Sequence, residues 1–205
     1  ASIGAGFGGT VLGLSGAVIG RAVGATLGRV IDERLLGAGT RPVETGRIDR
    51  LRLQFGRLDI TAEELEGRNQ RSALFKTMFL AFRAAGAKDW RSHLAIALDH
   101  SGSQHRLQFH HIFPKALLRG SYTPREADDI ANLAFIGGKT NRAISDKAPV
   151  TYLLPLVAQH GAAPFAAQCI PVEEELLALD HYKAFLQERR KRIAAALNAF
   201  IHATA

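Results

Sequence analysis

The sequence is poor in the residues that build disulfides and thiolate metal sites. One cysteine, Cys169, occurs among 205 residues, which excludes an internal disulfide and any zinc site built on cysteine pairs. We therefore expect a reducing compartment, the cytoplasm, and interpret Cys169 as a small core residue. No GxxxxGK[ST] loop occurs, so hydrolysis of nucleoside triphosphates is not expected. No lysine or arginine precedes the first apolar stretch, and a secretory signal is therefore not expected either.

Acidic residues are outnumbered by basic ones. The chain has 19 Asp and Glu against 26 Lys and Arg, a net charge of +7, and an isoelectric point near 10.0. Such an excess suits a polyanionic partner, either nucleic acid or an anionic membrane surface. The apolar fraction of 47% is that of a globular protein long enough to bury a core.

Lysine is absent from the first part of the chain. Every basic residue up to Arg57 is arginine, the first lysine is Lys76, and thirteen of the 20 glycines lie at or before Gly56. This change of composition predicts a junction between two units of separate origin, residues 1–56 and 57–205.

Residues 1–56 open with 20 residues that carry no charge, a length that would admit a membrane span. Gly16, Gly20, Gly24 and Gly28 recur every four residues, and arginines interrupt the stretch that carries them. This pattern favours a helix that packs closely against another helix over a membrane span. We expect a glycine-zipper helical segment that serves self-association or docking and is dispensable for chemistry.

The second unit is predicted to be α+β, mostly helical with a two-stranded insert. Apolar spacing predicts a helix over residues 74–82 that Gly86 ends, and Asp89 is expected to cap another helix over residues 90–98. The other predicted elements are strands at 106–113 and 132–137, a short helix at 139–145, a helix after Pro149, and a long amphipathic helix from Val172 to about His202 whose charged face includes Arg189–Arg192.

The segments FHHIFPK and ADDIANLAFIGGKTNRAISDKAP carry the candidate site. Hydrolysis of a phosphodiester needs a base for the water, a cation at the phosphate and relief of charge on the leaving oxygen. His110 and His111 are neighbours on a predicted strand, so one can face a metal while the other faces water. Asn141 can add an amide oxygen to the metal site. Asn132 can hydrogen-bond the loop that presents His111.

These motifs resemble the HNH (ββα-metal) endonuclease superfamily. HHIFP, ANL and TNRAISDKAP are similar to its pattern [D/E/H]-H-I-x-P, N-[LK] and N-R, and the NR-x-x-SD-x-x-P run resembles the HNH domain of RNA-guided CRISPR nucleases. A wider likeness over residues 62–203 is to the C-terminal nuclease module of GmrSD-type, modification-dependent restriction enzymes. It implies an α+β fold with a ββα-metal core and a role in restriction or phage defence. Their N-terminal nucleotide-dependent domain is not found in the sequence.

The resemblance implies a role for each motif residue. His111 is the implied general base, His110 and Asn141 the implied metal ligands, and Asn132 the structural asparagine. The implied reaction is metal-dependent hydrolysis of DNA that leaves 5′-phosphate and 3′-hydroxyl ends. Mg²⁺ is the implied cofactor. Many relatives have an acidic residue where His110 stands, and imidazole there makes Mn²⁺, Ni²⁺ or Zn²⁺ alternatives.

Charged residues flank the motifs. Lys115, Lys139 and Arg142 are expected to contact phosphates of DNA. Asp128 and Asp129 are placed in the loop between the strands, with a third metal ligand there as the less favoured interpretation.

The first unit has a resemblance of its own. The stretch GGTVLGLSGAVIGRAVGATLGRVIDERLLGAGTRPVETGRIDRLRL looks like the N-terminal region of baseplate or tail proteins from tailed phages and gene transfer agents. It implies phage-tail-like assembly and association with a particle. Two alternatives to a defence nuclease follow: a nuclease toxin delivered by a phage-tail-like particle, and a phage structural protein whose HNH module is inert.

Overall fold

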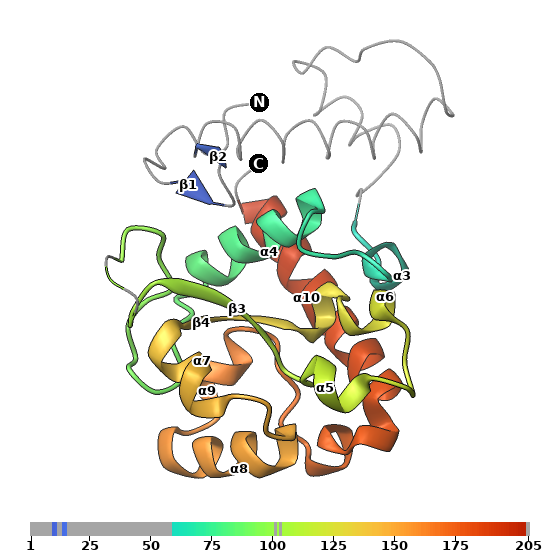
Figure 1. Ribbon diagram of the computed structural model, residues 1–205. Coiled ribbons are helices and arrows are strands. Elements are labelled where there is room, and N and C mark those ends of the chain that lie inside the picture. Colours follow the sequence, from blue (N-terminus) through green and yellow to red (C-terminus); the bar gives the residue numbers. More distant parts are fainter. Residues whose placement is uncertain (1–9, 12–13, 16–58, 101, 103, 204–205) are drawn as a thin grey trace. The chain divides into compact units, whose positions relative to one another are not determined.

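The computed structural model divides into two units, Ala1–Ile60 and Thr61–Ala203 (Figure 1). The residues that it describes are 10–11, 14–15, 59–100, 102 and 104–203. Among the helices of these residues, none combines the length and the apolar character that crossing a membrane requires.

In the first unit, strands β1 (Thr10–Val11) and β2 (Leu14–Ser15) pair antiparallel. The zipper glycines and the predicted junction after residue 56 lie outside the described residues. The glycine-zipper helix and the boundary between residues 1–56 and 57–205 therefore stay predictions.

The second unit is α+β and has helices around one two-stranded antiparallel sheet. Its strands are β3 (Leu107–His111) and β4 (Leu133–Gly137). Its α-helices are α3 (Ala62–Leu65), α4 (Ala73–Ala84), α5 (Lys115–Leu118), α6 (Pro124–Ala127), α7 (Gly138–Ile144), α8 (Pro149–His160), α9 (Ala163–Ala166) and α10 (Tyr182–Ala203). Short 3-10 helices are η2 (Ile130–Asn132), η3 (Glu174–Leu177) and η4 (Leu179–His181).

The β3–β4 pair lies between two groups of helices (Figure 1). Phe109 is opposite Phe135 and His110 is opposite Ala134, and successive residues of a strand point to opposite faces. On one face, the ring of Phe75 from α4 lies 5.1 Å from Phe109 and 5.0 Å from Phe135, centroid to centroid. On the other face, His110 points toward α7 and α8. Both predicted strands, and the short helix after them, are confirmed.

Helix α4 has the expected start and end. The hydroxyl of Ser72 accepts a hydrogen bond from the backbone N–H of Phe75 at 3.2 Å, which caps the first turn. Gly86 adopts φ +74°, where a side chain would be strained, and the helix ends just before it. The predicted apolar face is buried against the sheet, as the exposures of Leu74, Phe75, Met78, Phe79 and Phe82 show.

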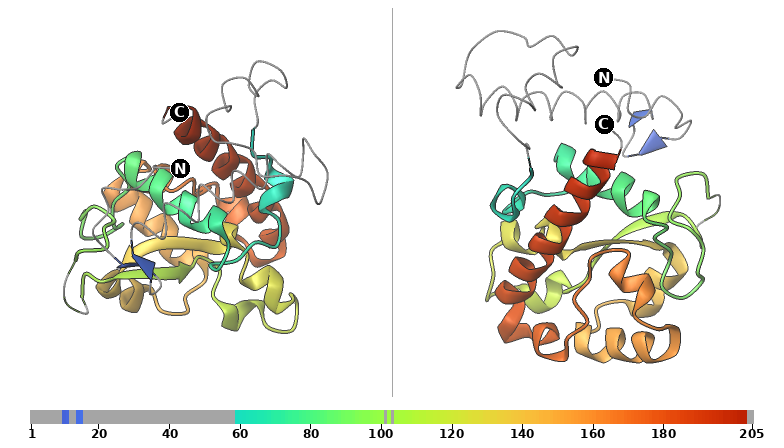
Figure 2. Two further views of the ribbon diagram at one scale, coloured as in Figure 1. Left: turned by 90° about the horizontal axis from the view of Figure 1, so that it is seen from above. Right: turned by 180° about the vertical axis from the view of Figure 1, so that it is seen from behind.

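Helix α10 runs along the back of the unit and contacts α3, α4 and η2 (Figure 2). It begins at Tyr182, so the predicted start at Val172 is wrong. The intervening chain forms η3 and η4, separated by Ala178 in an extended conformation with ψ 144°. An extended residue interrupts the hydrogen bonds between successive turns, and one continuous helix is therefore excluded over this stretch.

The prediction of a charged, solvated face over Arg189–Arg192 is wrong for its first two residues, whereas Lys191 is exposed as expected. Arg189 is fully buried and donates to the carbonyl oxygens of Ala131 at 2.7 Å and Gln168 at 3.1 Å. Arg190 is 9% exposed and donates to Asp129 at 2.6 Å. These guanidinium groups face the protein interior because the loop before β4 offers them acceptors.

Candidate active site

His110 lies near the end of β3 and is 3% exposed. Its Nδ1 lies 2.9 Å from Oδ1 of Asn141, which belongs to α7. Its Nε2 lies 3.1 Å from the hydroxyl oxygen of Tyr152, which belongs to α8. Burial lowers the pKa of His110 to about 4, although the contact with Asn141 acts in the opposite direction. The ring is therefore neutral near pH 7 and offers one lone pair.

His111 is turned toward the loop before β4. Its Nε2 lies 3.0 Å from Oδ1 of Asp128, and the same carboxylate oxygen lies 2.6 Å from Nζ of Lys115. Burial raises the pKa of Asp128, but the hydrogen bonds from Lys115 and His111 outweigh it and keep that pKa below its ordinary value. Asp128 is therefore a carboxylate near pH 7, and it can only accept hydrogen bonds.

This contact determines which nitrogen of His111 carries hydrogen. Because the carboxylate of Asp128 only accepts, Nε2 donates and Nδ1 keeps its lone pair. Within the part of the chain that the structure describes, Nδ1 has no hydrogen-bond partner. Burial lowers the pKa of His111, and its hydrogen bond to Asp128 acts against that shift. A neutral imidazole held by a carboxylate, with a free lone pair, is the arrangement of a general base.

Asn132 is fully buried and connects the two ends of the loop between the strands. Its side-chain oxygen accepts from the backbone N–H of Phe113 at 2.8 Å. Its side-chain nitrogen donates to the carbonyl oxygens of Phe113 and Ala127, both at 3.0 Å. These bonds fix the chain directly after His111 against the end of α6. The contacts agree with the expected hydrogen bonding of the loop that presents His111.

Asp129 fixes the same loop from behind and is fully buried. Its carboxylate accepts from the backbone N–H groups of Gly67 and Ala131, both at 2.8 Å. It also accepts from Arg190 at 2.6 Å. Asp129 is therefore a structural residue, and its neighbour Asp128 faces the candidate base.

The three predicted phosphate contacts lie in different surroundings. Lys115 begins α5 and is paired with Asp128. Lys139, on α7, is exposed and lines a hollow together with Arg91. Arg142, also on α7, lines a second hollow that includes Asn141. The residues around this second hollow are Gly102, Arg106, Gln108, Gly138, Asn141 and Arg142.

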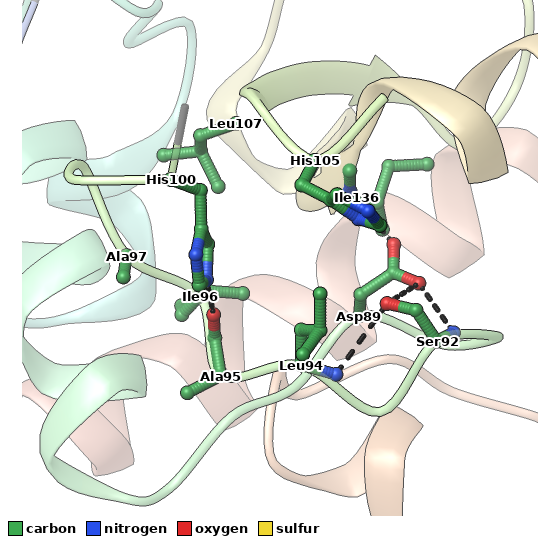
Figure 3. Close-up of a pocket in the computed structure, with 11 residues that line it drawn as sticks. Asp89, Ser92, Leu94, Ala95, Ile96, Ala97, His100, His105, Leu107 and Ile136 are labelled. Carbon is green, nitrogen blue, oxygen red and sulfur yellow. Dashed lines mark hydrogen bonds between the residues drawn. The ribbon is translucent and has the colours of Figure 1, made fainter. Parts of the chain in front are cut away.

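Asp89 joins its own turn to the start of α7, and Figure 3 shows its carboxylate beside Ser92 of that turn. It is 4% exposed, and its carboxylate accepts from the backbone N–H and the hydroxyl of Ser92, both at 2.8 Å. It also accepts from the backbone N–H of Gly137 and from the hydroxyl of Thr140, both at 2.7 Å. The start of α7, and with it Asn141, is thus fixed by a residue 48 positions away from Gly137.

The helix that Asp89 was expected to cap does not form. The carboxylate does accept from backbone N–H groups after it, as a cap does, but residues 90–92 form only a turn. His93 then adopts φ +57°, which is incompatible with a right-handed helix. Ala95 instead forms a bridge to Lys88. Asp89 therefore marks the start of a turn and not of a helix.

Acid is expected to weaken the contacts of Asp89 with Ser92, Gly137 and Thr140. Burial raises the pKa of Asp89, but hydrogen bonds from Ser92, Gly137 and Thr140 outweigh it and place that pKa below 3.8. The stabilisation is therefore present above pH 3.8 and is lost as the pH falls through the lower, folded-state pKa. Asp89→Ala should lower the free energy of unfolding by about 1–3 kcal/mol at neutral pH, and by less in acid. Urea unfolding at several pH values measures this.

The control for Asp89 is Asp99→Ala, because Asp99 is an exposed aspartate of the same segment. It should change the free energy of unfolding little at any pH. An Asp89→Ala effect that is equal at neutral and acid pH would contradict the role given to the carboxylate.

Two contacts of the site were not predicted from the sequence. The contact of Asp128 with His111 and that of Tyr152 with His110 bridge 17 and 42 positions of the chain. The available signals were the pair of aspartates before ANL and the tyrosine one turn into the helix after Pro149. Neither signal specifies a partner. Cys169 is half-buried, and burial raises the pKa of its thiol, which disfavours a nucleophilic role.

Comparison of the chain with models of protein families, with curated proteins and with solved structures gave no match.

Proposed function

We propose that the second unit is a metal-dependent endonuclease of the HNH type that hydrolyses phosphodiester bonds of DNA. The proposal rests on the distance of 2.9 Å between Nδ1 of His110 and Oδ1 of Asn141. His111, the candidate base, is the next residue after His110. These groups are presented by two antiparallel strands followed by a helix, β3, β4 and α7.

The donor set fits a divalent cation. Two ligands at right angles on one ion, each about 2.1 Å from it, lie about 3 Å from each other. Nδ1 of His110 and Oδ1 of Asn141 are 2.9 Å apart, and both atom types bind Mn²⁺, Ni²⁺ and Zn²⁺. Asn141 also lines the hollow with Arg106 and Arg142, through which an ion and a phosphate can approach. When bound, the cation would neutralise charge at the scissile phosphate and on the leaving oxygen.

The remaining roles belong to the chain's own groups. Nδ1 of His111 accepts a proton from the attacking water, and the carboxylate of Asp128 stabilises the imidazolium that forms. Asn132 keeps the chain after His111 in place through its bonds to Phe113 and Ala127. Arg142 provides positive charge in the hollow beside Asn141, where the DNA backbone binds.

Removing either proposed ligand should weaken metal binding. His110→Ala and Asn141→Ala should each reduce affinity for Mn²⁺ by about tenfold or more, because one of two protein ligands is lost. Excess Mn²⁺ should partly restore the activity of the Asn141→Ala variant. Calorimetric titration of the metal-free protein measures both changes. His100→Ala is the control, since His100 contacts the carbonyl oxygen of Ala95 instead. Unchanged affinity in both ligand variants would refute the site.

The activity itself is tested with supercoiled plasmid and Mg²⁺, Mn²⁺, Ni²⁺ or Zn²⁺, with a chelator as control. Unmodified and modified DNA are compared, because the wider resemblance is to modification-dependent restriction enzymes. Conversion of the supercoiled form to nicked or linear DNA, with ends that a ligase accepts, is expected with at least one metal. If neither DNA is cut with any of the four metals, the proposal is refuted.

A further inference from the structure

A buried tyrosine connects His110 to the backbone. Tyr152 of α8 is 5% exposed, and its hydroxyl donates to the carbonyl oxygen of Ile112 at 3.0 Å. The same oxygen lies 3.1 Å from Nε2 of His110. Trp90 packs against both rings, with centroids 5.7 Å from His110 and 6.4 Å from Tyr152. The phenol, the imidazole and the carbonyl group therefore form one buried hydrogen-bond network.

The direction of each hydrogen bond in this network follows from the number of hydrogens that its polar groups carry. The carbonyl oxygen of Ile112 can only accept, and the residue is fully buried. The Tyr152 phenol has one hydrogen, which it donates to the carbonyl oxygen of Ile112 at 3.0 Å. When the phenol donates to Ile112, its oxygen is left to accept, and Nε2 of His110 must donate.

The opposite direction takes a hydrogen-bond donor away from a buried group. If the phenol donated to Nε2 of His110, the carbonyl oxygen of Ile112 would lose its Tyr152 donor, at a cost of about 1–3 kcal/mol. With Nε2 protonated, Nδ1 of the neutral ring carries a lone pair that points at Asn141. A bare Nδ1 and the amide oxygen Oδ1 would both be acceptors. The contact is therefore favourable when the side-chain amide of Asn141 is turned so that its nitrogen donates to Nδ1, or when a cation lies between Nδ1 and Oδ1.

We propose that Tyr152 is a positioning residue that holds His110 in the Nε2–H tautomer and so keeps Nδ1 available as a metal-binding lone pair. The metal part of this inference rests on the proposed function, whereas the tautomer itself is a property of the chain alone. Groups that bind the second nitrogen of a ligating histidine commonly change metal affinity by about 10–100-fold.

The tautomer is measured directly in the metal-free, full-length protein. Long-range ¹H–¹⁵N correlation spectra distinguish the protonated from the bare ring nitrogen of each histidine. His110 should have hydrogen on Nε2 in the wild type. In Tyr152→Phe, which removes the hydroxyl and keeps the ring, His110 should gain a population with hydrogen on Nδ1, where Asn141 can accept it. Mn²⁺ affinity of this variant should fall by about 10–100-fold.

Tyr182→Phe is the matched control. Tyr182 is also buried, and its hydroxyl donates to the carbonyl oxygen of Glu126 at 2.7 Å, away from His110. This variant loses a comparable hydrogen bond and should leave the tautomer of His110 and the Mn²⁺ affinity unchanged. A loss of metal affinity in both tyrosine variants would show that general loosening, and not the Tyr152 hydroxyl, controls the site.

The outcomes separate this inference from the proposed function. Hydrogen on Nδ1 of His110 in the wild type overturns the inference even if metal binds and DNA is cut, and it does so without any variant. Hydrogen on Nε2 that shifts in Tyr152→Phe, with no metal bound by the wild type, supports the tautomer role and refutes the metal site. An unchanged tautomer in Tyr152→Phe overturns the positioning role.

Discussion

His111→Ala should cut DNA about 10²–10⁴-fold more slowly than the wild type at saturating metal, because the variant has no base to take the proton of the attacking water. Binding of DNA and metal should remain, since neither proposed metal ligand is changed. Single-turnover cleavage of a short labelled duplex measures the chemical step, and gel retardation in Ca²⁺ measures DNA binding separately.

The control is His181→Ala, an exposed histidine whose Nδ1 contacts the carbonyl oxygen of Glu175. Its cleavage rate should equal that of the wild type. Asp128→Asn should lie between these two variants, because the amide still contacts His111 but no longer carries the charge that favours the imidazolium. A His111→Ala protein that is folded by circular dichroism and cuts at the wild-type rate would exclude His111 as the base.

Asp129→Ala should lower the free energy of unfolding by about 3–5 kcal/mol, the largest effect on stability that we expect from one substitution. The change removes the buried carboxylate 2.6 Å from the guanidinium of Arg190, and leaves this group only the exposed Glu66 at 4.0 Å. It also removes the acceptor of the Gly67 and Ala131 backbone N–H groups. Urea unfolding followed by circular dichroism measures the loss.

The neighbouring aspartate is the matched control for this experiment. The side chain of Asp128 is 42% exposed, and Asp128→Ala should cost less than about 1 kcal/mol of stability while reducing cleavage. In an Asp129→Ala background, Arg190→Met should recover part of the stability, because it removes a buried charge that has lost its close partner. A loss below about 1 kcal/mol in Asp129→Ala would contradict the structural role given to the Asp129–Arg190 pair.

The strands, α4 and α7 could be predicted because their signals are local. Apolar and β-branched runs identify β3 and β4, and the spacing of the phenylalanines identifies the buried face of α4. The hydrogen bonding of Asn132 was predicted as well, since the loop that it binds is the one that the motif itself defines. Spacing along the chain was sufficient for these features.

Long-range partners could not be predicted in the same way. Arg190 meets Asp129 across 61 positions, and a run of four basic residues reads the same whether its partners are water or buried carboxylates. Asp89 has the signature of a helix cap, but its contact with Gly137 and the positive φ of His93 depend on the folded chain. These features follow from packing, which one sequence does not display.

The burial of Arg189 and Arg190 has a consequence for the order of events during protein synthesis. Both arginines belong to α10, which leaves the ribosome after β3, β4 and α8. Until they emerge, the nascent chain lacks the donors to Ala131 and Asp129 that fix the loop beside His111. Under the proposed function, a nascent chain that has been synthesised only through α8 should therefore be unable to cut nucleic acid, and this ability should arise when α10 docks.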